Sequence, residues 1–468
     1  MVCNGVACFD HIRIFSGFQS KFVKCACSDT CNIMGIETVV VYSEADKDAS
    51  YVKQAKESYC IGSPSPIKSY LNIESIVTVL KKSKADAVHP GYGFLSENAG
   101  FAKAVVSSGA IWIGPDPEVL ENIESKCYCR KLASELDLPV TPGTIQPIET
   151  IRDIYDLAES VGVPLMLKLD KGGGGKGIQR IDEIQDSKKM QAMLDSLQRV
   201  GVMAFASGDV YVEKVIERAR HIEVQFLADQ DQQVICLGER ECSIQRRYQK
   251  IIEESPSVVV SETERQRLFA YTKKLIQTMR YTGAGTIEYL RDIEGSYYFM
   301  EINARLQVEH PVTEYITKID IVEQQIRIAA GEKLAMQQQD VSFCGHAIEC
   351  RIYAEDPETF MPSPGIIRKL SLPDTIINTS LRIDSVAEEG GNVPPYYDPL
   401  FAKVISWGAD RQSAIEILKT GLMSFVVEGI KTTIRADLAI LNHPKFVAGD
   451  INTAFLSEEH CLAQAKLS

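Results

Sequence analysis

The chain has 468 residues, of which 45% are hydrophobic and 24% are charged, which is ordinary for a folded globular protein. It carries 50 lysine and arginine residues against 63 aspartate and glutamate residues, so its formal net charge is -13. This composition excludes a disordered chain, a collagen-like repeat and a small disulfide scaffold, and the acidic charge argues against general binding to nucleic-acid phosphates. The length predicts about three domains.

Neither a membrane segment nor a secretory leader is predicted. No apolar run reaches the roughly 18 residues that a transmembrane helix needs, and residues 1–18 lack the basic start and long apolar core of a signal peptide. The 13 cysteines form an odd number without regular spacing. Cys236, Cys242, Cys344 and Cys350 lie in or beside apolar runs, as small core residues do. We therefore expect a reducing, cytoplasmic setting and neither nucleic acid nor membrane as a partner.

The segment 1–122 predicts a parallel α/β layer, because strand-like and helix-like stretches alternate. Strands are expected at Ile36–Ser43 and Ala110–Pro115, and a helix is expected at Ile73–Ala85. Loops at the carboxyl ends of parallel strands commonly build binding sites. The loop His89–Asn98 follows such a strand and is a candidate for this role.

The segments 123–340 and 341–468 predict mixed α+β structure. In the first of them, strands are expected at 163–169, 178–181, 209–216 and 220–229. In the second, strands are expected at 346–355, 366–372 and 401–408, with prolines between the first two. The predicted fold class therefore combines α/β and α+β structure in three domains.

A glycine loop at Asp170–Gly177 follows the strand predicted at 163–169. Its consecutive glycines let backbone amides approach an anion, and neighbouring lysines add positive charge. It is not a P-loop, because Gly177 follows Lys176 where Ser or Thr is needed. A strand rather than a helix comes next, which disfavours a dinucleotide-binding loop. The loop predicts a flap over phosphates; the alternative is a tight hairpin without a ligand.

A carboxylate pair is predicted where the chain reads strand, turn, strand across 285–303. If the hairpin closes on Glu294-Gly295, Glu288 and Glu301 are direct cross-strand neighbours, with Cβ atoms about 4.5–5.5 Å apart. Two carboxylates that close repel unless a cation lies between them, and Mg²⁺ shared with phosphates suits such oxygens. Asn303 lies on the same face. The alternative is a solvated hairpin face.

Two further stretches concentrate groups that bind anions. Residues 303–314 place Arg305, Gln307 and Glu309 close together, and a cation, an amide and an acid can hold a small anion and offer a base. Residues 241–256 form a local basic cluster around Lys250 within an acidic chain. An ordinary polar loop is the alternative for the first stretch, and an exposed charged face is the alternative for the second.

Nine stretches in order resemble the biotin carboxylase family of ATP-grasp enzymes: "HPGYGFLSEN", "KLDKGGGGKG", "RHIEVQ", "ERECSIQRRYQK", "GTIEYL", "MEINARLQVEHPVTE", "HAIECRIYAEDP", "PPYYDP" and "VEGIKTT". The resemblance covers about residues 31–457 and is strongest to acyl-CoA carboxylase subunits of the acetyl-, propionyl- and methylcrotonyl-CoA type. No Met-Lys-Met motif is present, which resembles a separate subunit rather than a fused enzyme. The resemblance implies an N-terminal α/β domain, an ATP-grasp domain with a lid at about 142–213, and a C-terminal α+β domain.

The resemblance implies specific roles for residues in these stretches. The ATP phosphates would contact Lys126, Lys168 and the flap formed by Gly172, Gly173, Gly174, Gly175, Lys176 and Gly177. The adenine and ribose side would be formed by Glu213, Lys214, Ile216, His221, Gln245 and Leu290. Mg²⁺ or Mn²⁺ would bind Glu288, Glu301 and Asn303. Bicarbonate would bind Lys250, Arg305, Gln307 and Val308, with Glu309 as its general base, and Arg351 would stabilise the biotin enolate.

The implied reaction is carboxylation of biotin by ATP and bicarbonate through carboxyphosphate, which is the first half-reaction of an acyl-CoA carboxylase. The implied partners are a second copy of the chain in a homodimer, a biotin carboxyl carrier protein and a carboxyltransferase subunit. Two alternatives stay open. One is a catalytically impaired paralogue with the role of a partner subunit; the other is an ATP-grasp ligase that activates a different carboxylate.

The sequence departs from the family pattern at two places. Tyr248 replaces an adenine-site histidine of many relatives, and we expect this to be tolerated because tyrosine also offers a ring and a hydroxyl. At the start, Phe9–Ile14 is expected to be the first strand, but the family's Ala-Asn-Arg-Gly-Glu-Ile-Ala helix start is missing from residues 15–31. The segment is either damaged relative to the family, or it binds a metal through Cys25, Cys27 and Cys31 with Cys3 or Cys8.

Overall fold

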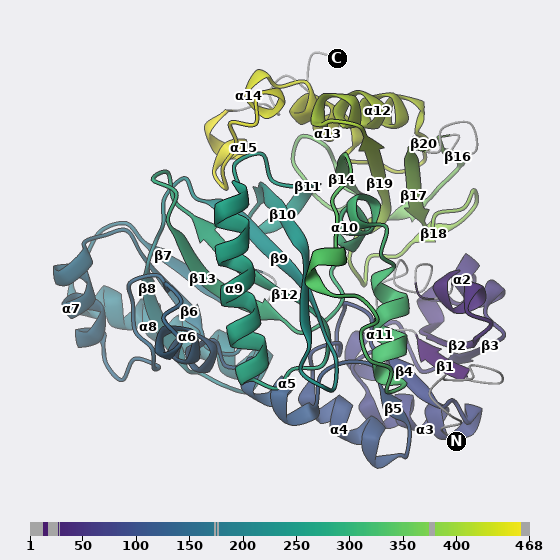
Figure 1. The fold of residues 1–468 in the computed structure, drawn as a ribbon, viewed down its shortest axis with the longest axis horizontal. Helices are drawn as coiled ribbons and strands as arrows, with labels where there is room; N and C mark the ends of the chain where they lie inside the picture. Colours follow the sequence, from purple (N-terminus) through teal and green to yellow (C-terminus); the bar gives the residue numbers. More distant parts are fainter. Residues whose placement is uncertain are drawn as a thin grey trace.

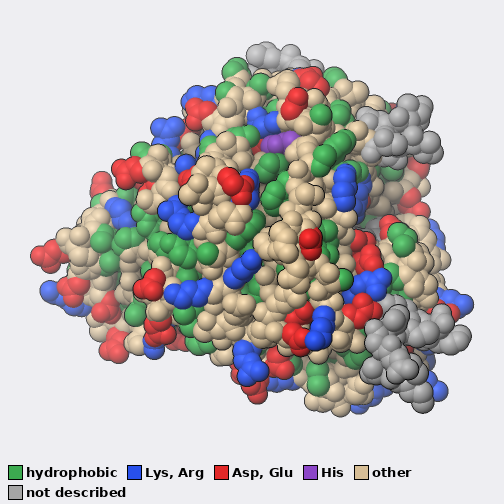
Figure 2. Space-filling view, viewed as in Figure 1, with side chains coloured by type: hydrophobic (Ala, Val, Ile, Leu, Met, Phe, Trp, Pro, Cys, Tyr) green, Lys and Arg blue, Asp and Glu red, His purple; other side chains and the backbone are tan. Residues whose placement is uncertain are grey.

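The computed structural model describes residues 13–16, 27, 29–172, 175, 177–373 and 380–459. Three layers of structure are visible in Figure 1: a parallel sheet near the N-terminus, a large antiparallel sheet through the centre, and a small sheet with two helices to one side. Within the described residues, no helix is both long and apolar enough to cross a membrane. On the face seen in Figure 2, acidic and basic side chains are interspersed rather than separated.

The N-terminal layer is a five-stranded parallel sheet in the order β3-β2-β1-β4-β5. Strand β1 is central, and its two apolar residues divide between cores: Phe15 packs in one hydrophobic cluster and Ile14 in another. This is the burial expected of a parallel strand that is covered on both faces. The elements are β1 (Arg13–Ser16), β2 (Glu37–Tyr42), α2 (Ser50–Gln54), β3 (Glu57–Cys60), α3 (Ile73–Ser83), β4 (Ala87–His89), α4 (Ala99–Ser107), β5 (Ile111–Trp112), α5 (Pro117–Ile123) and α6 (Lys126–Glu135), with 3-10 turns η1 (Glu44–Asp46) and η2 (Pro66–Lys68).

The first strand was expected at Phe9–Ile14, and the structure places it at Arg13–Ser16. The physical reason is that Ile14 and Phe15 are the residues buried between β2 and β4. Residues 9–12 lie outside the described part of the chain, as do Cys3, Cys8 and Cys25 of the metal hypothesis. Cys27 and Cys31 are described and buried. Because the other proposed ligands are not described, the metal hypothesis stays an untested prediction.

A small three-stranded antiparallel sheet, in the order β7-β6-β8, carries the glycine loop. Helices α7 and α8 pack on it, and their apolar faces fill its core. A capping box at Thr150 and Asp153 fixes the start of α7. The elements are α7 (Ile151–Val161), β6 (Leu165–Leu169), β7 (Ile178–Ile181), α8 (Ser187–Phe205) and β8 (Val210–Lys214).

The central sheet has eight strands in the order β13-β12-β9-β10-β11-β14-β19-β17. Its hydrogen bonding is continuous from the segment 123–340 into the segment 341–468, because β11 pairs with β14. The strands are β9 (Arg220–Ala228), β10 (Val234–Arg246), β11 (Gln249–Ser255), β12 (Gly283–Arg291), β13 (Tyr297–Asn303), β14 (His346–Tyr353), β17 (Leu381–Ser385) and β19 (Leu400–Gly408). The helices around it are α9 (Glu262–Thr278), α10 (His310–Thr317), α11 (Ile321–Ala329), α12 (Arg411–Ser424), α13 (Ile434–Leu441), α14 (Pro444–Val447) and α15 (Phe455–Glu458), with a 3-10 turn η3 (Gln338–Asp340).

The prediction of a single strand at 366–372 was wrong. The chain forms two short strands there, because it changes partners between them: Ile367 N–H donates to Gly391 and Arg368 N–H donates to Glu428. The resulting two-stranded sheets pair β15 (Gly365–Ile366) with β18 (Asn392–Val393), and β16 (Lys369–Ser371) with β20 (Val426–Glu428).

Candidate active site

The two lysines predicted to hold phosphates lie beside the glycine loop. Lys126 Nζ donates to the Gly172 carbonyl and lies 3.8 Å from a carboxylate oxygen of Glu301. Lys168 projects from β6 and pairs with Glu213 of β8, which lies two residues beyond Tyr211, the cross-strand partner of Lys168. Both ammonium groups therefore face the space between the small sheet and β13, where they are held by acceptors that an anion could replace.

The described part of the glycine loop needs glycine for steric reasons. Gly177 has φ +75°, and a Cβ there would lie 2.3 Å from Leu169 Cδ1. Gly175 has φ +71°, and a Cβ there would lie 3.0 Å from Tyr248 Cβ. Gly173, Gly174 and Lys176 lie outside the described residues. The loop thus approaches the turn between β10 and β11, which carries Tyr248.

The predicted pairing of Glu288 with Glu301 is confirmed, although the hairpin closes differently from the expectation. The turn is a five-residue loop, Asp292–Ser296, rather than a tight turn on Glu294-Gly295. Next to this loop, Tyr289 pairs with Phe299, so the register there is one residue off. A bulge at Met300 restores the register, and Glu288 then faces Glu301.

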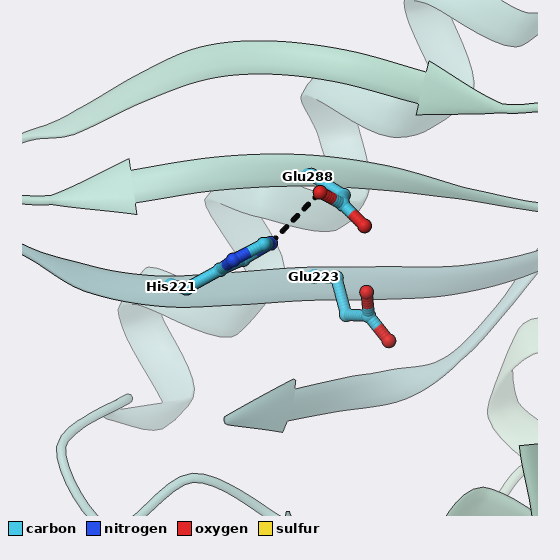
Figure 3. A group of neighbouring side chains, drawn as sticks. All are labelled: His221, Glu223 and Glu288. Atoms are coloured by element: carbon cyan, nitrogen blue, oxygen red, sulfur yellow. Dashed lines mark ion pairs between the residues drawn. The ribbon is translucent and has the colours of Figure 1, made fainter. Parts of the chain in front are cut away.

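Glu288 is buried and lies at the centre of a polar cluster (Figure 3). Its carboxylate receives hydrogen bonds from Asn303 Nδ2 at 2.9 Å and from Lys250 Nζ at 2.9 Å. His221 Nε2 lies 2.9 Å from the other oxygen of Glu288, and the second ring nitrogen of His221 is 2.6 Å from Gln245 Nε2. Neighbouring β9 and β12 present these groups side by side, because Glu288 pairs with Glu223 and His221 pairs with Leu290.

Lys250 joins three carboxylates. Its ammonium lies 2.6 Å from Glu223, 2.9 Å from Glu288 and 2.6 Å from Glu309. Burial would lower the pKa of Lys250, but the three carboxylates outweigh it and raise the pKa well above its usual value. Burial likewise would raise the pKa of Glu288, yet Lys250 and His221 hold it well below the usual range. Two of these carboxylates also pair with a second cation, since Arg240 bonds Glu223 and Arg351 bonds Glu309.

The donor atoms of this cluster suit a divalent cation. Among the described residues, His221, Glu223 and Glu288 form one group whose donor atoms all lie within 4.8 Å of one another, and Glu223, Cys242 and Glu309 form another. Carboxylate oxygens are the ligands that Mg²⁺ prefers. Glu301 belongs to neither group, so the predicted Mg²⁺ role of Glu301 stays a prediction.

Arg305, Asn303 and Gln307 form a second polar cluster directly after β13. Arg305 donates to Asn303 Oδ1 at 3.1 Å and to Gln307 Oε1 at 3.0 Å. Glu97 fixes the guanidinium from the other side, since it accepts from Arg305 Nε at 2.9 Å and from the Ala304 amide at 2.8 Å. Glu97 ends the loop that follows β4, so the parallel sheet contributes directly to the site.

Glu309 links the two halves of the site. It is fully buried, accepting from Lys250 at 2.6 Å through one oxygen and from Arg351 at 3.0 Å through the other. Burial would raise its pKa, but Lys250 and Arg351 hold the pKa of Glu309 well below the usual range. Arg351 comes from β14 and is also bound by Glu253 of β11, whose pKa burial raises to about 7. The groups predicted for bicarbonate and for biotin therefore share one carboxylate.

Several predicted nucleotide-side residues lie away from this cluster. The Glu213 side chain is buried against Arg130 at 2.7 Å and Thr141 at 2.7 Å. Burial would raise the pKa of Glu213, but Lys168 and Arg130 lower it. Lys214 donates to the Val163 carbonyl at 2.7 Å. Ile216 lies in the loop between β8 and β9. Leu290, in contrast, lies beside the cluster, on β12 between His221 of β9 and Tyr298 of β13.

Sequence reasoning missed three carboxylates that hold the predicted cations. Glu223 pairs with Lys250, Glu97 with Arg305, and Glu253 with Arg351. The sequence held a signal for Glu223, because it follows His221 by two residues and so lies on the same face of the strand. Glu97 and Glu253 are far in sequence from the arginines they bind, so no local spacing could have identified them.

Three family models match the chain in order. They are "Biotin carboxylase, N-terminal domain" at residues 22–120, "Carbamoyl-phosphate synthase L chain, ATP binding domain" at residues 125–337 and "Biotin carboxylase C-terminal domain" at residues 349–458. Biotin carboxylase 2 of Bacillus subtilis is 46% identical over 429 residues, covering 92% of this chain and 95% of the relative. The propionyl-CoA carboxylase alpha chain of Ruegeria pomeroyi is 40% identical over 456 residues, covering 94% of this chain and 66% of the relative.

Solved structures agree with these sequence matches. A biotin carboxylase of Campylobacter jejuni in an ATP complex has a TM-score of 0.91 and 38% identity, covering 96% of this chain and 99% of that chain. A biotin carboxylase domain dimer of the Hydrogenobacter thermophilus 2-oxoglutarate carboxylase, with MgADP, ADP and bicarbonate, has a TM-score of 0.92 and 37% identity, covering 96% and 98%. The ATP-binding model, the three-domain fold and the cluster around Lys250 define an ATP-grasp enzyme. The chain belongs to the biotin carboxylase family.

Proposed function

We propose that this chain carboxylates biotin on a separate carrier protein, using ATP, Mg²⁺ and bicarbonate. The observation that carries the proposal is the position of Glu309, which is buried between Lys250 and Arg351. An anion bound at Lys250 and a group bound at Arg351 would both lie next to the same carboxylate. A site that joins bicarbonate to a second substrate needs this proximity.

On the ATP side, Lys126, Lys168 and the glycine loop would bind phosphates, and Glu288, Glu301 and Asn303 would hold Mg²⁺. Mg²⁺ supplies charge neutralisation between phosphate oxygens when it is bound. Glu213, through its contacts with Lys168 and Arg130, would hold Lys168 ready for phosphate.

On the bicarbonate side, Lys250, Arg305, Gln307 and Val308 would bind the anion, and Glu309 would accept its proton. While Lys250 contacts Glu309, this carboxylate is a weak base because its pKa is low. Bicarbonate bound to Lys250 would draw the ammonium away from Glu309 and raise the pKa of the carboxylate, which favours proton transfer. The base would thus gain strength only when its substrate is present.

Carboxyphosphate would release carbon dioxide and phosphate, and the phosphate would take the proton of the biotin ureido nitrogen. Arg351 would stabilise the negative oxygen of the resulting enolate while the ureido nitrogen forms its bond to carbon dioxide. Glu253 holds the guanidinium through Arg351 Nε at 2.6 Å, which would keep it oriented. Because biotin on a carrier must reach this residue, a biotin carboxyl carrier protein is the proposed partner.

The identity of the final acceptor would lie with a separate carboxyltransferase subunit. Similar chains are named as biotin carboxylases and as a propionyl-CoA carboxylase alpha chain, and one similar structure is described as the biotin carboxylase subunit of pyruvate carboxylase. We propose an acyl-CoA carboxylase, because the stretches around 213–225 and 351–365 most resemble subunits of that class. A homodimer is proposed because one similar structure is described as a domain dimer. A cytoplasmic setting is proposed because the described cysteines are free thiols, all of them buried except Cys60 and Cys344, which is exposed although it was expected in the core.

The alternative of an impaired partner subunit is favoured by one observation. The N-terminal family model begins to match at residue 22, so β1 lies outside the matched region. The assay described next distinguishes the active enzyme from the impaired subunit.

The test is ADP release by the purified chain with Mg²⁺ and bicarbonate, with and without free biotin. We expect biotin to stimulate ADP release, and we expect Arg351→Met to lose that stimulation. Arg265→Met is a matched control, because Arg265 also bonds a buried carboxylate, that of Glu239, but does so from α9. A folded, ATP-binding chain without turnover would support the impaired subunit, and stimulation that survives in Arg351→Met would remove Arg351 from its proposed role.

A further inference from the structure

A short loop connects β13 to α10 and contains most of the residues proposed to bind bicarbonate. Gln307, Val308 and Glu309 are consecutive in it, and α10 begins at His310. Two buried side chains contact the backbone of this loop: Lys403 from β19 and His310 itself. Helix α10 packs against β14 and β19, which brings these side chains together (Figure 1).

Lys403 donates to the Val308 carbonyl at 2.8 Å. Its side chain is 1% exposed, and its Cα is aligned across the sheet with Arg351 on one side and Asp384 on the other. The ammonium also lies 3.2 Å from Asp384, which supplies the nearest negative charge. Of its described partners, only the Val308 carbonyl belongs to the proposed bicarbonate loop.

A second carboxylate, that of Glu349, lies farther from the Lys403 ammonium than Asp384 does. Glu349 Oε2 is 3.7 Å away, and neither oxygen of Glu349 has a hydrogen-bond partner among the described residues. Burial raises the pKa of Glu349 well above its usual value, although the charge of Lys403 opposes this. Lys403 is therefore directed toward Asp384 and the Val308 carbonyl.

The His310 side chain contacts the carbonyl of Gln307, one residue before Val308. Its Nδ1 lies 2.8 Å from the Gln307 oxygen, and because a carbonyl only accepts, the ring nitrogen is the donor. Burial, together with the charges of Lys403 and Arg382, holds the pKa of His310 well below its usual value, so the ring is neutral. The neutral ring keeps its proton on Nδ1, where this hydrogen bond needs it.

These two hydrogen bonds fix consecutive peptide planes. The Gln307 carbonyl shares a rigid plane with the Val308 N–H, and the Val308 carbonyl shares one with the Glu309 N–H. Holding each carbonyl therefore sets the direction of the following N–H and limits rotation of the backbone that carries Glu309. A buried charged donor is suited to this, because its hydrogen bonds are stronger than those between neutral groups.

We propose that Lys403 and His310 are positioning residues that hold the peptide planes of Gln307 and Val308, and so preorganise the backbone that binds bicarbonate and presents its base. The inference rests on the proposed function, which it extends from the residues that contact bicarbonate to the residues that hold them. It assigns to the β19 lysine a task in substrate affinity as well as in packing.

The first experiment compares Lys403→Met with Lys403→Arg in the full chain, measuring KM for bicarbonate and KM for ATP in biotin-stimulated ADP release. We expect Lys403→Met to raise the bicarbonate KM about tenfold or more, the loss typical of a hydrogen bond from a charged donor, and to change the ATP KM by less than about twofold. Lys403→Arg keeps a charged donor and should recover most of the affinity. An unchanged bicarbonate KM in folded Lys403→Met overturns the proposal.

Arg411→Met is the matched control for loss of a cation that bonds a buried carboxylate. Arg411 also bonds a buried carboxylate, that of Glu254, at 2.6 Å and a backbone carbonyl, that of Val447, at 2.9 Å, in the same part of the chain. It should lower stability while leaving the bicarbonate KM within about twofold, since it makes these bonds away from residues 305–310. An increase equal to that of Lys403→Met would mean that general destabilisation, and not positioning, is responsible.

His310→Phe tests the neighbouring peptide without a change of charge, and it carries the test if Lys403→Met does not fold. We expect a several-fold higher bicarbonate KM with little change in the ATP KM, because a neutral hydrogen bond is worth about 1 kcal/mol, or roughly a factor of five. A bicarbonate KM equal to that of the unsubstituted chain would contradict the role of His310.

Failure of the proposed function is distinguishable from failure of this inference. If the unsubstituted chain releases no ADP in response to bicarbonate and biotin, the proposed function fails. Binding of ¹³C-labelled bicarbonate in the presence of MgADP, followed by NMR, then compares the same variants without turnover. Weaker binding in Lys403→Met than in Arg411→Met supports the positioning role, and equal binding overturns it.

Discussion

Replacing Glu309 with glutamine tests the proposed base directly. The substitution keeps the shape of the side chain and removes its charge. In the structure, Glu309 accepts from Lys250 at 2.6 Å and from Arg351 at 3.0 Å. The amide keeps one acceptor oxygen, so about one charge-assisted hydrogen bond is lost, which is worth about 1.5–3 kcal/mol of stability. Loss of a general base lowers kcat by a further factor of about 10²–10⁴.

ATP binding should survive this substitution, because Lys250 keeps its contacts with Glu223 and Glu288. The assay is bicarbonate-dependent ADP release, combined with ATP affinity by calorimetry. Glu254→Gln is the matched control, since it also removes a buried carboxylate that is paired with a cation. A folded Glu309→Gln variant with kcat within about threefold of the unsubstituted chain would refute the reasoning, because a base is expected to contribute far more.

Two further predictions concern metal affinity and pH. Glu288→Gln should raise the Mg²⁺ concentration needed for half-maximal activity about tenfold or more, since it removes a charged ligand from the cluster; an unchanged requirement would remove Glu288 from the metal site. Burial would raise the pKa of Glu254, but His346 and Arg411 lower it from 4.5 to about 2. This contribution to stability is therefore complete above the ordinary pKa and is lost as pH falls from 4.5 toward 2, and it amounts to about 3 kcal/mol. Urea unfolding at pH 7 and pH 3 should show about 2 kcal/mol of this loss in the unsubstituted chain, and Glu254→Gln should lose less stability over the same range; equal losses would contradict it.

Much of the large-scale fold could be predicted from the sequence, because hydrophobic patterns repeat with the period of each element. The helix expected at Ile73–Ala85 is observed at Ile73–Ser83, and the strand expected at 178–181 is observed at those residues. The first strand was expected to end at Ile14 but continues to Ser16, because its pairing with the neighbouring strands buries both Ile14 and Phe15. Local pattern alone does not contain that information.

The carboxylate pair was predicted correctly for an incomplete reason. Counting residues across a tight turn gave the right partners, but the actual loop is longer and a bulge at Met300 compensates for it. Glu97 illustrates what sequence reasoning cannot provide. It binds Arg305 from a loop 208 positions away in sequence, and only the packing of the parallel sheet against the central sheet brings them together.

Strands β11 and β14 meet in the middle of one sheet, yet they belong to segments that a family comparison treats as separate. Cutting the chain near residue 340 would turn both strands into bare edges, whose unpaired amides and carbonyls promote aggregation. The cut would also separate Lys250 from Arg351, each of which reaches Glu309. The two segments therefore have to be inherited together. Recombination between relatives could exchange the small glycine-loop sheet, but an exchanged β14 would need a matching β11 from the same relative.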